Sequence, residues 1–175
     1  MTEPTQPHQQ ARPDATAVVE EALRKASIAW ITVAGAPATA AWCLGVDGVL
    51  HVVCGPGEQR LPGLADGVAA QVTLRGDHGG QIVTWTASAS RIGPDDPGWA
   101  VAAPQLAAKR LNVSGPADQL VGRWARECAI FRLSPTGAAA TGAELPRGSG
   151  SEAPRPTPAA RPTRKPFRLH RVRGA

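Results

Sequence analysis

The sequence predicts an α+β protein: a mainly antiparallel, six-stranded β-barrel with flanking helices, followed by a disordered basic C-terminal tail. Several short runs rich in β-branched and aromatic residues follow one another, and tight turns join most of them. Helical patterns occur only at the start of this region and late in it. The chain has 175 residues, which leaves room for a single domain of about 100–150 residues with extended ends.

The N-terminal part is expected to form a disordered arm and one helix. Residues 1–13 are polar and contain three prolines, a composition typical of disorder. Asp14 can cap a helix that runs to about residue 26. Within it, Val19 and Leu23 recur at helical spacing and give the helix one apolar face.

Three strands are expected next, joined by two tight turns. Residues 28–33 and 38–46 form the first two strands, and the Gly-Ala-Pro sequence at 35–37 turns the chain between them. The Asp-Gly sequence at 47–48 is a strong hairpin signal, because both central residues of a type I′ turn need positive φ. Residues 49–54 then form the third strand.

The remaining elements follow a Gly/Pro-rich segment at residues 55–66. Three more strands and two helices are expected after it: strands at 70–75, 81–92 and 128–133, and helices at 94–111 and 117–126. Pro104 is a position at which the first of these helices can break. Leu120 and Trp124 share one face of the second helix.

Basic charge is concentrated in the C-terminal tail. Residues 1–143 hold 11 Lys and Arg against 12 Asp and Glu, whereas residues 144–175 hold 8 against 2. This division excludes a generic basic nucleic-acid-binding surface on the folded domain. From residue 136 the chain has too little apolar content to offset its ordering entropy. We therefore expect three parts: a disordered arm at 1–13, a folded domain at 14–135 and a disordered tail at 136–175.

The tail ends in a cationic peptide at residues 163–174, in which three apolar residues are interleaved with Lys and Arg. Such a density of positive charge can bind phosphate backbones weakly and without sequence specificity. We expect a solubilising or weakly polyanion-binding tail rather than a specific nucleic-acid reader.

Cysteine, histidine and hydropathy patterns favour a cytoplasmic protein that holds no metal. The 3 Cys form no C-x-x-C pair, and the 4 His lack metal-ligand spacing. Unpaired cysteines favour reduced thiols in a cytoplasm, and the N-terminus lacks a signal-peptide pattern. The uncharged stretch at 26–46 is long enough to span a bilayer, but it is mostly Ala, Thr and Gly with a turn in its middle. We therefore expect no membrane segment.

The common catalytic motifs are absent, so no residue is nominated as catalytic. The informative segment is the loop after the third strand, where Gly55 and Gly57 precede Arg60. Glycines let the backbone approach an anion and expose its N–H groups, and arginine binds phosphate through two parallel hydrogen bonds. From these residues alone, a plain turn with a solvent-facing Arg60 is the simpler alternative.

The order of these elements resembles the pyridoxamine 5′-phosphate oxidase-like family of FMN-binding split β-barrels. The resemblance covers about residues 15–135 and includes the hairpins, the glycine loop, the long strand, the late helix and the closing strand. Members of this family have Lys or Arg in the loop after the third strand and Leu four residues later, and Arg60 and Leu64 fit this spacing. They also carry a bulky, commonly aromatic residue near the flavin, in the segment where Trp42 stands.

The resemblance implies a flavin-binding homodimer that acts as an oxidoreductase on an unknown small molecule, with FMN as cofactor and a deazaflavin or haem as alternatives. The residues that it places at the cofactor are Thr39, Trp42, Gly55, Gly57, Arg60, Lys109 and Arg110. Glu58 and Gln59 stand where the family has a small hydroxyl residue and Lys, and a carboxylate repels a phosphate dianion. Two alternatives therefore stay open: a cofactor-free binding or interaction module, and a nucleic-acid-associated protein that acts through its tail.

Three other residues have structural interpretations. Trp85 lies on a strand, and we expect it to pack in the core or at a dimer interface. His51 is expected to be a satisfied histidine of an apolar strand. Cys54 is expected to be a buried and inert thiol.

Overall fold

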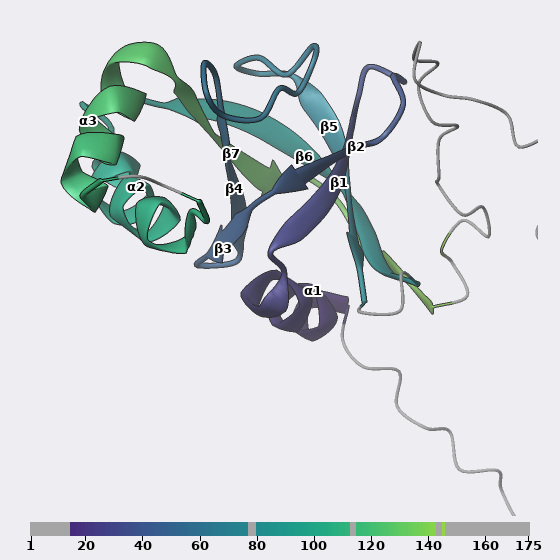
Figure 1. Cartoon of the computed structure of the whole chain (residues 1–175). Helices are drawn as coiled ribbons and strands as arrows, with labels where there is room; N and C mark the ends of the chain where they lie inside the picture. Colours follow the sequence, from purple (N-terminus) through teal and green to yellow (C-terminus); the bar gives the residue numbers. More distant parts are fainter. Residues whose placement is uncertain (1–14, 77–79, 113–114, 143–144, 146–175) are drawn as a thin grey trace, which may run out of the picture.

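The computed structural model describes residues 15–76, 80–112, 115–142 and 145. The expected N-terminal arm, its neighbour Asp14 and most of the expected tail lie outside the described residues. Figure 1 shows a strongly curved sheet, with α2 and α3 side by side on one flank and α1 below it. In chain order the elements are α1 (Ala15–Lys25), β1 (Ile28–Val33), β2 (Thr39–Trp42), β3 (Leu44–Val46), β4 (Val49–Cys54), β5 (Ala69–Arg75), β6 (Gln81–Ile92), α2 (Pro97–Lys109), α3 (Ala117–Glu127), β7 (Ala129–Pro135) and β8 (Ala140–Thr141).

The sheet is antiparallel and closes on itself through one segment of chain. Its strand order is β2-β1-β5-β6-β7-β4-β3, and β8 pairs with β6. Strands β2 and β3 stand at opposite ends of this order, although only Cys43 separates them in sequence. The short segment from β2 to β3 therefore joins the two edges, and it makes a corner at Cys43, whose N–H donates to the carbonyl oxygen of Ser27 at 2.9 Å.

The expected α+β class with a mainly antiparallel split barrel is confirmed. The number of strands differs, because the expected strand at 38–46 is divided into β2 and β3. Its first half pairs with β1 and its second half with β4, so one continuous strand would have to face two partners at once. The two-residue strand β8 adds the eighth member.

The expected hairpin at the Asp-Gly sequence is confirmed. Asp47 has φ 49° and Gly48 has φ 74°, which are the positive values that a type I′ turn requires. On either side of the turn, Val46 pairs with Val49.

Apolar side chains are buried on both faces of the sheet. One core fills the barrel interior and includes Val52, Trp85 and Leu133. A second core lies between the outside of the sheet and the helices α2 and α3, and it includes Val53 and Trp124. Adjacent residues of β4 therefore point to different cores, which explains why this strand has no alternating polar face.

Helix α2 runs through Pro104 without a break. Pro104 lies on the exposed side of the helix, as does Ala100, the residue four positions earlier. The carbonyl that loses its helical hydrogen bond therefore faces water, which reduces the cost of the proline.

The chain stays on the sheet beyond the expected domain end at residue 135. The Thr136 N–H donates to the Thr86 carbonyl at 2.9 Å, and β8 pairs with β6 through Thr141. None of the described helices is long and apolar enough to cross a membrane.

Candidate functional site

The glycine loop after β4 packs closely against the domain. Gly55 has φ 147° and Gly57 has φ 72°. A Cβ atom on Gly55 would lie 2.9 Å from the Cα of Cys128, and one on Gly57 would lie 3.0 Å from a guanidinium nitrogen of Arg123. Both glycines thus allow the loop to approach β7 and α3, and any anion-binding role of their N–H groups remains a prediction.

Glu58 turns its carboxylate into this contact. Its side chain is only 1% exposed. Arg110 Nε donates to Oε2 at 2.8 Å, while Arg123 Nη2 and Trp124 Nε1 donate to Oε1 at 2.5 and 2.9 Å. We call Glu58, Arg110, Arg123 and Trp124 the Glu58 cluster. Two guanidinium groups compensate the buried charge of Glu58. The repulsion expected between this carboxylate and a ligand phosphate is therefore partly offset by the two arginines beside it.

Gln59 holds the end of β2. Its carboxamide accepts from the Trp42 backbone N–H at 2.8 Å and donates to the Trp42 carbonyl at 2.9 Å. A side chain here makes the two bonds that a neighbouring strand would make. Gln59 therefore fixes the backbone of Trp42 at the corner of the barrel.

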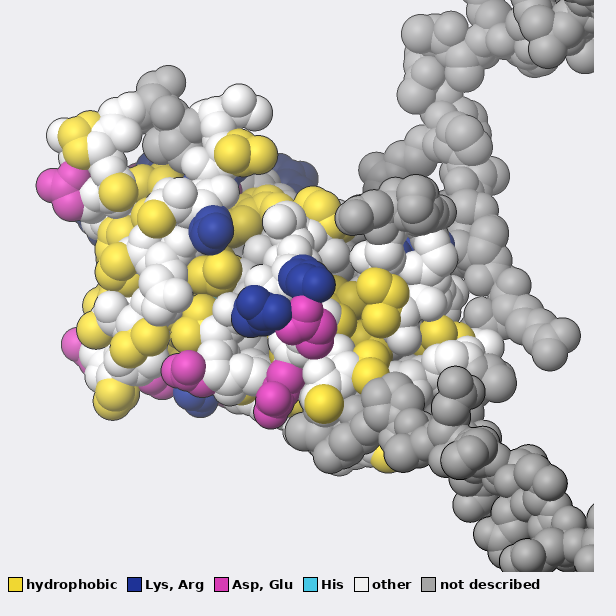
Figure 2. All heavy atoms as spheres, turned by 90° about the horizontal axis from the view of Figure 1, so that it is seen from below, with side chains coloured by type: hydrophobic (Ala, Val, Ile, Leu, Met, Phe, Trp, Pro, Cys, Tyr) yellow, Lys and Arg dark blue, Asp and Glu magenta, His cyan; other side chains and the backbone are white. Residues whose placement is uncertain are grey.

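A hollow of about 500 Å³ lies beside this corner. We call it the basic hollow, because four of its lining residues are cationic and none is acidic. Its walls are the C-terminal ends of α1 and α2 and the corner between β2 and β3. The lining residues are Arg24, Lys25, Ala26, Ser27, Ile28, Trp42, Cys43, Leu44, Lys109, Arg110 and Leu111. Figure 2 looks at the α1 side of the molecule and shows basic side chains close to apolar ones on this face.

The cations of the basic hollow differ in how far they are already paired. Arg24 and Lys25 both form exposed ion pairs with Glu21, and Arg110 pairs with Glu58. Among the described residues, Lys109 has no hydrogen-bond or ion-pair partner. Lys109 is therefore the cation of this lining whose charge is least compensated by the protein.

Trp42 forms an aromatic wall of the basic hollow. The Arg110 guanidinium carbon lies 5.6 Å from the centre of its ring, a cation–π arrangement. The Trp124 ring lies 6.2 Å away, tilted by 33°. The Trp42 Nε1 is buried without a hydrogen-bond partner among the described residues, and it is not exposed to the hollow.

The structure brings three of the predicted cofactor residues together: Trp42, Lys109 and Arg110 all line the basic hollow. Gly55 and Gly57 lie outside its lining, on the loop that carries Glu58.

Arg60 and Thr39 lie elsewhere. Arg60 is exposed and has no ion-pair partner among the described residues. Thr39 lines a separate hollow of about 200 Å³ with Leu61. The predicted set is therefore divided among the basic hollow, the glycine loop with Arg60, and the separate hollow at Thr39.

Sequence reasoning did not nominate Arg123 or Trp124 for the site, or foresee what Glu58 and Gln59 bind. Both bonds from α3 to Glu58 span at least 65 residues, so no local pattern contains them. The only sequence signal was an acidic residue inside a Gly/Pro-rich loop.

Cys43 is buried, whereas Cys54, which was expected to be buried, is half-buried; the pKa values of both thiols and of His51 are shifted. Burial raises the pKa of Cys43 to about 12 and that of Cys54 to about 11, so both stay protonated at neutral pH. Burial also lowers the pKa of His51. Its Nδ1 is buried without a hydrogen-bond partner among the described residues, so the expectation of a satisfied histidine is wrong for this atom. Trp85 is 2% exposed in the barrel core, in agreement with its structural interpretation.

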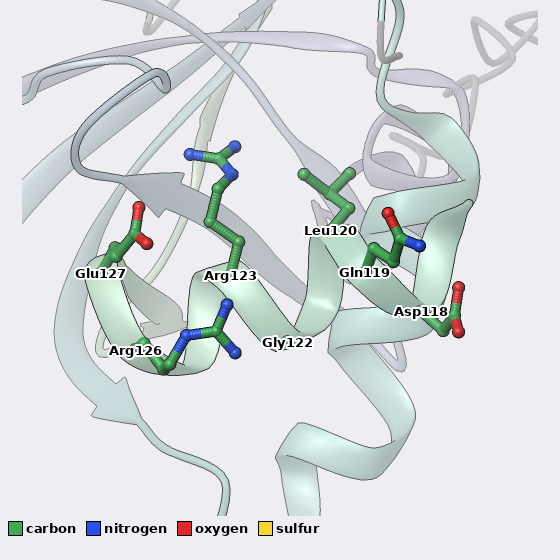
Figure 3. A pocket seen from close by; sticks show the side chains of 7 residues that line it. All are labelled: Asp118, Gln119, Leu120, Gly122, Arg123, Arg126 and Glu127. Atoms are coloured by element: carbon green, nitrogen blue, oxygen red, sulfur yellow. The ribbon is translucent and has the colours of Figure 1, made fainter. Parts of the chain in front are cut away.

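A larger hollow of about 680 Å³ lies along α3. It is lined by both acidic and basic side chains, and Figure 3 shows Arg123 rising from the helix while Arg126 lies across it. Its residues are Asp118, Gln119, Leu120, Gly122, Arg123, Arg126 and Glu127. It contains no aromatic side chain and none of the predicted cofactor residues, so it suits a ring-bearing ligand less well than the basic hollow does. The described residues also contain no group of three or more His, Cys, Asp or Glu that could hold a metal ion.

No protein-family model matches the sequence, and no curated protein is similar to it in sequence. Solved structures do resemble the fold. HutZ, a haem storage protein from Vibrio cholerae, has 14% identity and a TM-score of 0.54, over 70% of this chain and 91% of HutZ. The flavocytochrome Anf3 from Azotobacter vinelandii has 16% identity and a TM-score of 0.47, over 86% of each chain. A FAD- and haem-binding protein from Mycobacterium smegmatis has 18% identity and a TM-score of 0.45, over 77% of this chain and 73% of that one.

The likeness to HutZ shows the fold of the chain. The split-barrel fold that the sequence resemblance implies is thereby confirmed, and the likeness extends to the fold alone. Identity this low carries no statement about the ligand or the reaction.

Proposed function

We propose that the protein binds a ring-bearing, acidic cofactor of the flavin type in the basic hollow, and that it acts as an oxidoreductase through that cofactor. The observation that carries this proposal is the gathering of Trp42, Lys109 and Arg110 around one hollow without an acidic lining residue. Its volume of about 500 Å³ lies within the usual range for small-molecule sites.

The lining residues fit the two halves of such a ligand. Lys109, whose side chain has no ion-pair partner among the described residues, would hold the phosphate, and Arg110 would assist it. Trp42 and Leu44 would pack on the ring. A bound flavin would supply the hydride or electron chemistry, while these residues bind and orient it.

The lining favours a flavin over haem. HutZ is a haem storage protein, and haem iron takes ligands such as His or thiolate. No histidine lines the basic hollow among the described residues, and its one cysteine, Cys43, has a pKa of about 12. Because a thiol must lose its proton to bind a metal, Cys43 is a poor ligand. FMN and a deazaflavin are therefore the first candidates.

The second candidate function is a binding module without redox activity. The Glu58 cluster favours it, because the loop that the resemblance assigns to the phosphate is occupied by a carboxylate of the chain itself. In that case the role of these loop residues would be structural only, and none of Gly55, Gly57 and Arg60 would bind a ligand.

A homodimer belongs to the same proposal. Ile28 and Leu111 are 49% and 76% exposed, and both line the basic hollow. A second copy that covers them would bury apolar surface and complete the hollow. Light scattering at micromolar concentration should give twice the monomer mass, and a monomer mass would refute this part.

Two other expectations remain proposals. The three cysteines are free in the structure, which supports a reducing compartment such as the cytoplasm. The composition of residues 144–175 supports weak binding of polyanions.

Two matched variants test where the cofactor phosphate binds. Lys109→Ala and Arg60→Ala each remove one cation that has no described partner, so their cost in stability is similar and small. Titration of FMN and of a deazaflavin by fluorescence quenching should show Lys109→Ala binding about ten- to hundredfold more weakly than the wild type. Arg60→Ala should bind like the wild type.

The reverse result would place the phosphate at the glycine loop, as the resemblance implies. Equal affinity of the wild type and both variants would mean that the cofactor phosphate binds neither Lys109 nor Arg60. Failure of the wild type to bind either flavin would favour the module without redox activity.

A further inference from the structure

The Glu58 cluster has the form of an anion-binding site whose occupant belongs to the same chain. We propose that Arg110, Arg123 and the indole N–H of Trp124 form a cradle for a compact oxyanion, of which phosphate is the best match, and that Glu58 fills this cradle in the resting protein. This proposal does not rest on the proposed function, since the cradle lies at the glycine loop and needs no flavin.

The donors of the cradle converge on one point. Arg110 Nε, Arg123 Nη2 and Trp124 Nε1 reach the two oxygens of a single carboxylate within 2.9 Å. Three N–H groups from two different elements are the kind of set that binds phosphate oxygens.

Other bonds hold the donors independently of Glu58. Arg123 Nη1 donates to the Pro56 carbonyl at 2.7 Å, and Arg110 Nη1 donates to the Leu111 carbonyl at 2.6 Å. The Trp124 ring is fully buried in the second core. Removal of the carboxylate therefore leaves a pre-formed set of donors rather than three free side chains.

The charges of the cradle favour a dianion. Two guanidinium groups face one carboxylate, and no other described carboxylate pairs with either arginine. Glu58 thus neutralises half of the positive charge, whereas the phosphate dianion would neutralise all of it. The arginine side chains are 24% and 30% exposed while Glu58 is 1% exposed, so an anion from solvent can reach the arginines once Glu58 is absent.

A tethered carboxylate competes at a high effective concentration. In the wild type Glu58 should therefore exclude free phosphate from the cradle. An acidic group of a ligand should therefore not bind Arg123, and should bind instead to cations that have no bond to Glu58.

The test compares Glu58→Ala with Glu21→Ala in the full chain. Glu21 is also bonded by two cations, Arg24 and Lys25, but it is 47% exposed on α1. Because these two cations line the basic hollow, Glu21→Ala is the control for phosphate that binds there instead of in the cradle. Thermal unfolding is followed in inorganic phosphate and in chloride of equal ionic strength. Phosphate at about 100 times its Kd should raise the Tm of Glu58→Ala by on the order of 5–10 °C above its Tm in chloride. The wild type and Glu21→Ala should show a smaller difference, which reports only the phosphate that binds outside the cradle.

A second readout locates the anion. In ¹H–¹⁵N spectra, the indole N–H signal of Trp124 should move in Glu58→Ala and should move again, with saturation, as phosphate is added. A phosphate effect in Glu58→Ala no larger than in Glu21→Ala would overturn the proposal. If Glu58→Ala does not fold in either salt, Glu58→Ser removes the carboxylate, leaves the space of the cradle open and keeps a small polar side chain in the loop. Absence of a saturable phosphate shift of the Trp124 signal in Glu58→Ser would then overturn it.

Discussion

At the scale of single residues, the corner of the barrel depends on side chains that replace backbone partners. Gln59 makes the two bonds to Trp42 that a strand would otherwise make, and Arg110 bonds Glu58 while lying over the Trp42 ring. The wall of the basic hollow and the Glu58 cluster therefore share Arg110. Substitutions in the wall of the basic hollow and in the Glu58 cluster should therefore have non-additive effects on stability, unlike substitutions at sites without shared partners.

The buried thiols give a prediction at this scale. An unfolded cysteine has a pKa near 8.5, whereas burial raises the pKa of Cys43 to about 12 and that of Cys54 to about 11. At pH 8 the native protein should react with iodoacetamide more slowly than the protein in urea, on the order of 100-fold for Cys54 and on the order of 1,000-fold for Cys43, because the thiolate is the reacting species. Peptide mapping by mass spectrometry measures each rate separately.

The same shifts fix the pH dependence of stability. Above pH 8.5 the unfolded chain loses these protons while the folded chain keeps them, so the free energy of unfolding should fall as the pH rises toward about 11. Equal alkylation rates in the native and unfolded states, or stability that does not change across this interval, would contradict the burial of the two thiols.

The residues of the candidate site were predictable only through the family resemblance. Trp42, Lys109 and Arg110 were expected at a cofactor, and they do line one hollow. The partners of Glu58 lie 52 to 66 residues away in sequence. Only the packing of α2 and α3 against the sheet brings them together, and no spacing rule describes it.

At the scale of elements, α1 packs on β3 through a glycine. A Cβ atom at Gly45 would lie 2.5 Å from the Leu23 carbonyl oxygen, which is backbone and cannot rotate away. We expect Gly45→Ala to destabilise the protein by about 1–3 kcal/mol through overpacking. Because Arg24 and Lys25 follow Leu23, the displacement of α1 should also change the wall of the basic hollow.

Gly93→Ala is the matched control. Nothing lies within 4 Å of a Cβ atom at Gly93, and its φ is not in the left-handed region. Its midpoint in urea unfolding should equal that of the wild type or exceed it slightly. Equal midpoints for Gly45→Ala and the wild type would mean that α1 does not sit on β3 as described.

Regular elements were predicted well because their signals are local. Residues 28–33, 49–54 and 81–92 were expected as strands and are strands, and the Asp-Gly turn has the expected positive φ values. The division of residues 38–46 was missed, because it depends on a change of partner that only the closed sheet imposes.

At the scale of the whole molecule, the described residues form a sheet joined edge to edge, with two cores. The class of fold followed from the order of turns and strands, and the structure confirms it. The extent of the sheet could not be read from composition, since the Ala-, Gly- and Thr-rich stretch after Pro135 looks like a tail but supplies β8.

The last prediction concerns the charge of the whole chain. Residues 146–175 hold 8 of the 19 Lys and Arg and one of the 14 Asp and Glu, while every described helix and strand lies before them. Deleting these residues should change the Tm by no more than about 2 °C, because a segment of this Pro-, Arg- and Gly-rich composition has little apolar surface to bury. Retention on heparin or DNA should be lost, since the remaining chain carries a net negative charge. For the full chain this retention should fall steeply with salt, as the release of counterions requires.

A fall in Tm of 5 °C or more would make the C-terminal residues part of the folded domain. Retention that survives the deletion would move polyanion binding to the barrel, where Lys109 and Arg60 would be the first cations to substitute.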